Sequence, residues 1–140
     1  MLSGLKGTGG RMDSFEYKMS KSDPNNAIIL HDSKDVLRKK MKKAFLEVGN
    51  DSSAIFEIVE HVIIPRMGKI VVTPDPKYGA PSSFSNSGDF VSSVSEGNVH
   101  PLDAKIAVAD ALSEILSPVS KYFQDNPELL ERMESFSAFN

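Results

Sequence analysis

The chain has 140 residues, of which 40% are hydrophobic and 25% charged, and its net charge at pH 7 is −3. This composition predicts one small soluble domain, or a piece of a larger one, and argues against a uniformly basic nucleic-acid binder. The sequence contains no cysteine, which excludes disulfides and cysteine-based metal sites. No apolar run approaches the roughly 18 residues of a membrane span, and no signal peptide is evident, so we expect a cytoplasmic protein.

Residues 1–26 are rich in glycine and lack helical periodicity, which indicates the end of a strand followed by a long loop. The loop contains the segment Lys18-Met19-Ser20-Lys21-Ser22. A lysine is a point charge that can follow a phosphate, and a short loop can close over a polyphosphate. The segment therefore suggests a phosphate-binding loop. Taken alone it is equally compatible with an ordinary solvated loop.

The next elements are a short apolar run and a basic helix. Residues 27–30 are expected to form a brief strand or a turn of buried chain. Asp32 or Ser33 then caps a helix from about Lys34 to Leu46. The apolar stripe of this helix consists of Leu37, Met41, Ala44, Phe45 and Val48, and the lysines are expected on the opposite face.

The basic helix carries six like charges within ten residues, namely Lys34, Arg38, Lys39, Lys40, Lys42 and Lys43. Like charges spaced four residues apart repel each other by about 0.2–0.5 kcal/mol per pair. A sequence that tolerates this repulsion favours an anionic partner, so we interpret the run as a phosphate-binding face. A solvated helix face is the alternative.

The middle of the chain predicts a helix, a small sheet and a further helix. The first helix starts after Asp51 or Ser52, and Pro65 is expected to end it. Residues 69–73 have strand propensity, residues 74–81 form a rigid loop rich in proline, and Phe84 opens a short second strand. Ser87 is expected to cap a helix over residues 88–95, which Gly97 closes.

The C-terminal part begins with the clearest helix start in the chain. Pro101 suits the first helical position, and the helix is expected to run to about Ser117, with Pro118 beginning another segment. A last helix starts at Asn126-Pro127. The sequence thus predicts a mainly α fold with a small β element near residues 69–86. The side chains expected to point inward from the long helix are Leu102, Ile106, Ala109, Leu112, Ile115 and Leu116.

Two side chains stand out as candidates for ligand contact. Tyr78 lies on the proline-bounded loop, where an exposed aromatic ring can stack on an unpaired base, and a core tyrosine is the equally weighted alternative. Asp103 follows the helix start, and without further context we interpret it as a partner of the helix dipole rather than as a ligand contact. The histidines at 31, 61 and 100 show no metal-ligand spacing, so a metal site is not expected.

The order of these motifs resembles tyrosyl-tRNA synthetase of the archaeal and eukaryotic type. The segment at 18–22 reads KMSKS and precedes Asp23-Pro24, and the basic helix, Lys77-Tyr78-Gly79 and the segment from His100 to Lys105 follow in the order of the family. The resemblance implies that residues 1–32 form the C-terminal edge of a Rossmann-type class I catalytic domain. Residues 33–140 would then be a helical anticodon-binding domain.

The resemblance also implies roles for individual residues. Lys18 and Lys21 would neutralise the phosphates of ATP during tyrosine activation, in a nucleotide-binding loop that includes Met19, Ser20 and Ser22. Tyr78 would stack on the first anticodon base of tRNA-Tyr, a guanine, and the Asp103 carboxylate would accept its hydrogen bonds. The residues expected to contact tRNA are Tyr78, His100, Asp103, Arg38, Lys39, Lys42 and Lys43.

Further expectations concern partners and departures from the family. ATP, accompanied by Mg²⁺, would be a substrate, and no tightly bound cofactor is expected. The His-x-Gly-His motif and the tyrosine pocket are absent, so the chain would be a C-terminal part of the enzyme and inactive alone. The full-length enzyme would be a homodimer, and no membrane partner is expected.

Ala80 and Ser120 stand where the family usually has a glycine and a basic residue. A free-standing tRNA-binding module and a tryptophanyl-tRNA synthetase fragment are the alternatives.

Overall fold

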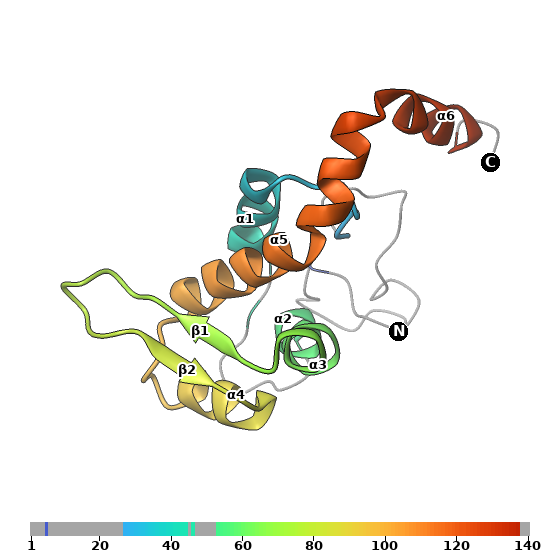
Figure 1. Cartoon of the computed structure of the whole chain (residues 1–140). Coiled ribbons are helices and arrows are strands. Elements are labelled where there is room, and N and C mark those ends of the chain that lie inside the picture. The colour runs from blue at the N-terminus through green and yellow to red at the C-terminus, as the bar shows by residue number, and fades with distance from the viewer. Residues whose placement is uncertain (1–4, 6–26, 45, 47–52, 138–140) are drawn as a thin grey trace, which may run out of the picture.

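The computed structural model describes residues 5, 27–44, 46 and 53–137, and within them the chain is mainly helical with one two-stranded sheet (Figure 1). This confirms the predicted mainly α fold with a small β element. The loop at 18–22 lies outside the described residues. In chain order the elements are α1 (Lys34–Lys43), α2 (Ala54–Ile58), η1 (Val59–Ile63), α3 (Ile64–Met67), β1 (Ile70–Val72), β2 (Ser82–Phe84), α4 (Ser87–Ser95), α5 (Pro101–Asp125) and α6 (Pro127–Ser137).

Helix α1 begins where the sequence predicts. The Ser33 hydroxyl accepts a hydrogen bond from the backbone N–H of Val36 at 3.3 Å, which satisfies one of the free donors of the first turn. The helix ends at Lys43 rather than Leu46. Residues 27–30 form no strand, and a turn closes at 29–32, where the Asp32 N–H donates to the Ile29 carbonyl at 2.9 Å. The predicted stripe is confirmed for its described members, because Leu37, Met41 and Ala44 are buried. Its other two members, at positions 45 and 48, lie outside the described residues.

The prediction that Pro65 ends the second helix is wrong. Segments α2, η1 and α3 follow one another without a break, and the Ile64 N–H donates to the carbonyl of Val59, five residues back. This wider π turn falls immediately before Pro65, at the place where a proline ring would crowd the carbonyl of a regular α turn. Gly68 ends the helix, with a φ of 77° that favours glycine.

Strands β1 and β2 pair antiparallel, with Ile70 opposite Phe84 and Val72 opposite Ser82. Ile70 and Val72 are buried and Val71 is exposed, as the two-residue period of a strand requires. The following helix α4 matches the prediction except at its cap. Asn86, not Ser87, accepts the N–H of Asp89 at 2.8 Å.

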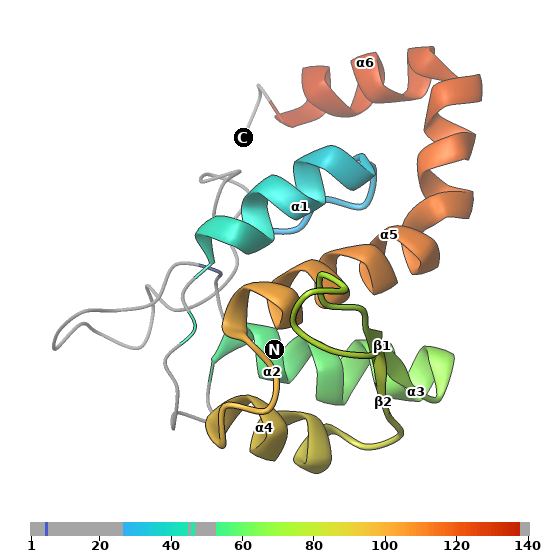
Figure 2. The same cartoon turned by 90° about the vertical axis from the view of Figure 1, so that its left-hand side faces the viewer.

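Helix α5 is longer than predicted, because Pro118 does not end it. The helix runs from Pro101 to Asp125, and it changes direction along its length (Figures 1 and 2). A proline inside a helix removes one backbone hydrogen bond and bends the axis without always terminating it. The predicted inward face is wrong at Leu102, whose side chain is 43% exposed. Helix α6 starts after Asn126, as predicted.

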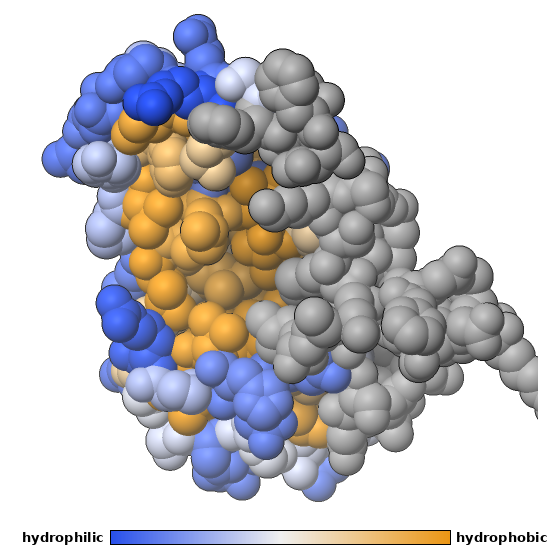
Figure 3. All heavy atoms as spheres, turned by 90° about the vertical axis from the view of Figure 1, so that its right-hand side faces the viewer, coloured by the Kyte–Doolittle hydropathy of each residue, from blue (hydrophilic) through white to orange (hydrophobic). Residues whose placement is uncertain are grey.

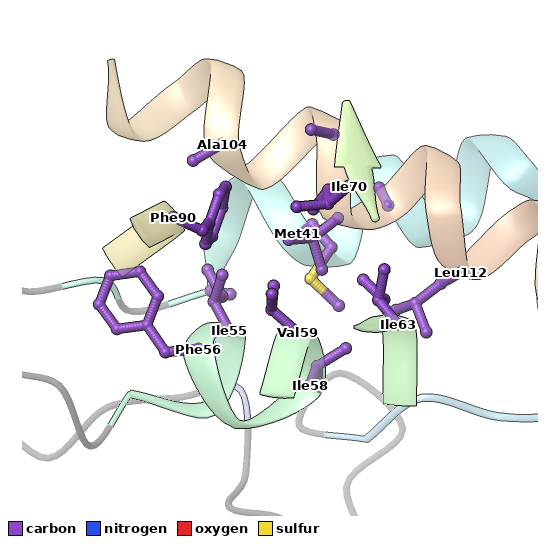
Figure 4. Packing of buried hydrophobic residues seen from close by; sticks show 14 of the residues in the cluster. Met41, Ile55, Phe56, Ile58, Val59, Ile63, Ile70, Phe90, Ala104 and Leu112 are labelled. Atoms are coloured by element: carbon purple, nitrogen blue, oxygen red, sulfur yellow. The ribbon is translucent and has the colours of Figure 1, made fainter. Parts of the chain in front are cut away.

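The core lies between α5 and the segments that cover it. Helix α1 packs along α5, and β1 and the α2–η1 helix pack against α5 as well (Figure 2). Figure 4 shows Met41, Val59, Ile63 and Ile70 converging on this interior, all of them buried. Phe90 completes it at the α4 side. The ring centroids of Phe56 and Phe84 lie 6.1 and 5.7 Å from that of Phe90, in edge-to-face geometry.

A second apolar region faces outward. Apolar side chains gather on the surface turned to the viewer in Figure 3, which is the right-hand side of Figure 1. Within the described ranges, no helix combines the length and apolar character needed to cross a membrane.

Candidate nucleic-acid interface

The loop between β1 and β2 presents Tyr78 to solvent. The Asp75 carboxylate accepts the backbone N–H of Lys77 at 3.0 Å, and the Asp75 carbonyl accepts that of Tyr78 at 2.8 Å. These bonds close a tight turn, and residues 75–80 are all exposed. Tyr78 is 83% exposed, so the alternative of a core tyrosine is wrong. Gly79 follows with a φ of 140°, which a residue with a side chain rarely adopts.

The start of α5 places two polar side chains near each other. The His100 Nδ1 accepts the backbone N–H of Leu102 at 3.1 Å and so caps the helix. A neutral imidazole that accepts at Nδ1 carries its hydrogen on Nε2, which leaves that atom as a donor for a ligand. Asp103 lies in the first turn and is half-buried. Its carboxylate has no hydrogen bond or ion pair with another described residue.

One cleft joins these two regions. It has a volume of about 710 Å³ and lies between the β1–β2 loop and the start of α5. That volume falls in the range of small-molecule and nucleotide sites. The structure therefore brings together three residues predicted to contact tRNA, although 22 to 25 positions separate the tyrosine from the other two. The residues that line the cleft include Pro74, Asp75, Tyr78, Gly79, Val99, His100, Leu102 and Asp103.

Helix α1 is less free to bind phosphate than its sequence suggests. The Arg38 guanidinium donates from Nε and Nη2 to the two carboxylate oxygens of Asp110, at 2.7 and 2.9 Å. This two-bond geometry joins α1 to α5. The hydrogen bonds to Asp110 and its charge raise the pKa of Arg38 above the usual value. Lys34 lies 4.0 Å from the same carboxylate.

Lys40 is buried, so the prediction that the lysines of α1 all lie on the solvent face is wrong there. The side chains of Lys40 and Asp32 are each only 9% exposed, and their Nζ and Oδ2 atoms are 2.6 Å apart. Nζ also donates to the Ala27 carbonyl at 3.0 Å. The Asp32 carboxylate accepts the backbone N–H of Ile29 at 2.9 Å. A buried pair of this kind holds the turn at 27–32 against α1.

The remaining lysines of the basic run on α1 can still contact a ligand. Lys39, Lys42 and Lys43 are exposed, and none forms an ion pair with a described residue. Sequence reasoning missed a fourth lysine nearby. Lys105 of α5 donates to the Lys42 carbonyl at 3.5 Å, at the C-terminal end of α1, and burial lowers the pKa of Lys105. The sequence signal for Lys105 was its place at the end of the segment from His100 to Lys105.

The structure does not describe the predicted nucleotide-binding loop, residues 18–22. The roles of Lys18 and Lys21 therefore stay predictions. In the part of the chain that is described, no group of three or more histidine, cysteine, aspartate or glutamate side chains could hold a metal ion.

Comparison with known proteins places the chain in a family. The family described as "tRNA synthetases class I (W and Y)" matches residues 13–117. The chain is 34% identical to the tyrosine–tRNA ligase of Thermococcus sibiricus over 122 residues, which covers 86% of this chain and 32% of the relative. It is 35% identical to that of Pyrococcus furiosus, again over 86% of this chain and 32% of the relative.

A solved structure agrees with the sequence comparison. The tyrosyl-tRNA synthetase of Pyrococcus horikoshii, complexed with L-tyrosine, superposes with a TM-score of 0.83 at 32% identity, over 96% of this chain and 39% of that chain. The chain therefore belongs to the class I tRNA synthetases of the tryptophanyl and tyrosyl type. The relatives named here are archaeal tyrosine–tRNA ligases, and this chain spans about a third of their length.

Proposed function

We propose that this chain is the tRNA-recognising C-terminal part of a tyrosine–tRNA ligase. The cleft that unites Tyr78, His100 and Asp103 carries the proposal, because it offers one stacking surface and two polar groups of different character to a single base. Family membership supplies the context, and all the relatives named above are tyrosine enzymes.

The chemistry of the cleft suits an unpaired guanine. The exposed ring of Tyr78 offers a face on which a base stacks, a contact worth about 1–3 kcal/mol. The Asp103 carboxylate, which has no described partner, can accept two hydrogen bonds from the N–H groups on the Watson–Crick edge of guanine. An adenine would present an acceptor to the same carboxylate and would be rejected. His100 can donate from Nε2 to a ribose or phosphate oxygen.

Phosphate contacts would come from the exposed lysines of α1. Lys39, Lys42 and Lys43 lie on the helix whose C-terminal end meets Lys105, and Lys105 follows Asp103 by two positions. Cationic side chains elsewhere on the same domain can bind the backbone of the RNA whose base lies in the cleft. Arg38 is predicted from the sequence to share this role, but in the structure its donors face Asp110.

The catalytic part of the proposal concerns the loop at 18–22. Lys18 and Lys21 would stabilise the charge on the phosphates of ATP, with which Mg²⁺ would be bound, as pyrophosphate leaves. Tyrosine activation by this chain alone is not expected, because the chain spans about a third of the relatives and lacks the family's His-x-Gly-His motif. ATP–pyrophosphate exchange measured with the isolated chain would therefore stay at background.

Binding of tRNA tests the recognition part directly. The chain should bind tRNA-Tyr more tightly than tRNA-Trp, and replacing the first anticodon guanine by adenine should remove the preference. Equal affinity for the two tRNAs would contradict the proposal, and a preference for tRNA-Trp would select the tryptophanyl alternative. If exchange stays absent even when the N-terminal part of a relative is added, while tRNA-Tyr binding persists, the chain is a free-standing binding module.

A further inference from the structure

The cleft beside Tyr78 has room for more than the ring of one base. Its volume of about 710 Å³ lies in the range of pockets that enclose drug-sized ligands, which are larger than a bare purine. A base of an RNA enters the cleft joined to its ribose, so the sugar is the part of the ligand that fills the remaining space. The polar side chains along the cleft then decide how the sugar is bound.

A second carboxylate lines the cleft, and base recognition leaves it unused. Asp75 belongs to the β1–β2 loop and Asp103 to the first turn of α5, so they lie on the two walls between which the cleft opens. The Oδ1 atom of Asp75 accepts the backbone N–H of Lys77 at 3.0 Å. Its Oδ2 atom has no hydrogen bond or ion pair with a described residue, and the residue is exposed, so this oxygen can accept a hydrogen bond from a ligand.

The turn that carries Asp75 fixes the carboxylate relative to the stacking ring. The backbone carbonyl of Asp75 accepts the N–H of Tyr78 at 2.8 Å, and the bond from the Lys77 N–H holds Oδ1. Both hydrogen bonds lie within the turn at 75–78, so the carboxylate and the ring belong to one small rigid unit. A nucleotide that stacks on Tyr78 therefore meets the Asp75 carboxylate in a fixed place.

The shape of guanine directs its ribose toward this carboxylate. The Watson–Crick edge, which the Asp103 carboxylate would hold on the α5 side, and the glycosidic nitrogen lie at opposite ends of the purine. A guanine bound to Asp103 thus points its sugar away from α5 and toward the β1–β2 loop, where Asp75 lies. The ribose 2′-hydroxyl has a hydrogen to donate, and a carboxylate accepts it in a short, charge-assisted bond of about 2.5–2.7 Å.

The charge of Asp75 favours the sugar over a phosphate as its neighbour. A carboxylate repels the phosphodiester anion and attracts the hydrogen of a hydroxyl group. Among the described residues, no cation forms an ion pair with Asp75 that would cancel this effect. Ser82 and Asn98 also line the cleft, but both are neutral, and Asn98 already donates to Glu96 at 3.1 Å. Apart from Asp103, Asp75 is therefore the strongest acceptor among the described residues of the lining.

We propose that Asp75 is a specificity-determining residue, which accepts a hydrogen bond from the ribose 2′-hydroxyl of the nucleotide stacked on Tyr78. The cleft then distinguishes a ribonucleotide from a deoxyribonucleotide at this one position, whichever base the nucleotide carries. The inference rests on the proposed function, because it takes a nucleotide of the tRNA to be the ligand of the cleft. It assigns Asp75 a role in binding and none in the chemistry of tyrosine activation.

The experiment removes the proposed donor from the RNA and the proposed acceptor from the protein. The two probes are the anticodon stem-loop of tRNA-Tyr and the same RNA with a single 2′-fluoro group at the first anticodon nucleotide. Fluorine keeps the sugar pucker of RNA but has no hydrogen to donate. The parent chain should bind the unmodified RNA roughly tenfold more tightly, as expected for a hydrogen bond to a charged group.

Asp75→Asn keeps an oxygen for the Lys77 N–H and replaces the free oxygen by an amide nitrogen, so the turn is retained. The ratio of the two affinities should fall to about two- to threefold, the size of a weak neutral contact. Asp125→Asn at the end of α5 is the matched control, because it removes an equal charge from an exposed carboxylate that is not among the described residues of the lining. It should leave the ratio at the parent value, as should a 2′-fluoro group placed in the stem.

The outcomes distinguish this inference from the proposed function. Equal binding of the two RNAs by the parent would overturn the inference, and so would a ratio that Asp75→Asn leaves unchanged. The proposed function is measured separately, as the preference for guanine over adenine at the first anticodon position. If guanine and adenine bind equally while the effect of the 2′-hydroxyl remains, guanine recognition is refuted and the role of Asp75 stands.

Discussion

The cleft at the start of α5 and the charged contacts of α1 use their carboxylates in opposite ways. In the cleft, Tyr78 is 83% exposed and the Asp103 carboxylate has no described partner. On α1, Arg38 is bound to Asp110 of α5 at 2.7 Å and Lys40 to Asp32 of the preceding turn at 2.6 Å. The first region is open to a ligand, and the second has already satisfied its charges internally.

This difference shows that a run of like charges is not one functional unit. The six cations of α1 look equivalent in the sequence, but the structure divides them by their partners. Two are held firmly, Lys34 lies near the limit of an ion pair, and three are free of described partners. Substitutions along α1 should therefore separate effects on the stability of the fold from effects on the affinity for tRNA.

The largest effect is expected from Lys40→Met. The change leaves the carboxylate of Asp32 buried without a counter-charge, which costs about 3–5 kcal/mol in proteins. Urea unfolding should show this loss, or the domain should fail to fold. Lys39→Met on the exposed neighbour is the control and should lie within about 0.5 kcal/mol of the parent.

A second variant keeps that prediction interpretable. Combining Lys40→Met with Asp32→Asn removes the unpaired charge, so stability should recover in large part. If the double variant is as unstable as Lys40→Met alone, the ion pair is not the reason for the loss.

Tyr78→Ala should give the next largest effect, now on binding. Loss of the stacking surface should weaken tRNA-Tyr binding by about 1–3 kcal/mol, while Tyr78→Phe retains it. Because the ring is exposed, neither change should alter the urea midpoint. Fluorescence anisotropy with labelled tRNA measures the affinity. Equal binding by the alanine and phenylalanine variants would show that the ring does not stack on a base.

Asp103→Asn should act on specificity more than on affinity for RNA in general. An amide replaces one acceptor oxygen by a donor, which opposes the N–H groups of guanine. The preference for guanine over adenine at the first anticodon position should fall by about 1–3 kcal/mol. Competition between two stem-loops that differ in this base measures the ratio. A ratio that stays at the parent value would remove Asp103 from base recognition.

Arg38 and Lys42 test the division within α1. Lys42→Ala should reduce the slope of log affinity against log salt by about 0.7–0.9, the value for one phosphate contact. Arg38→Lys loses the two-bond contact with Asp110 but keeps the charge, and it should leave that slope unchanged. If Arg38→Lys lowers the slope as much as Lys42→Ala does, then Arg38 reaches phosphate and its pairing with Asp110 gives way to tRNA.

The sequence predicted the order and type of most elements because their signals are local. The cap at Ser33, the helix start at Pro101 and the β1–β2 pair follow from short-range chemistry. The two errors at proline share one cause. The expected stops at Pro65 and Pro118 assume that a lost hydrogen bond ends a helix, whereas a single proline can be accommodated, at Pro65 by the π turn before it and at Pro118 within a continuous α5.

The candidate site was predictable in part, because the signals for its single residues are also local. Tyr78 and Asp103 stand in short motifs, so the sequence could nominate them singly. That they line one cleft depends on how the β1–β2 loop folds back toward α5, which no local pattern encodes. The sequence did not predict the partners of Arg38 and Lys40. Asp110, the partner of Arg38, lies 72 residues away along the chain, and Asp32, the partner of Lys40, was predicted to be a helix cap.

The smallest effect expected where α1 meets α5 concerns pH and Lys105. Burial lowers the pKa of Lys105 below the ordinary 10.5, so the unfolded chain binds its proton more readily than the folded protein does. Stability contributed by this group is therefore complete above pH 10.5 and is lost as the pH falls through the folded-state pKa. The stability of the parent relative to Lys105→Met should rise between these two values. Unfolding in urea across that window, with Lys43→Met as the exposed control, measures it. If the Lys105→Met and Lys43→Met variants change with pH in the same way relative to the parent, burial does not lower the pKa of Lys105.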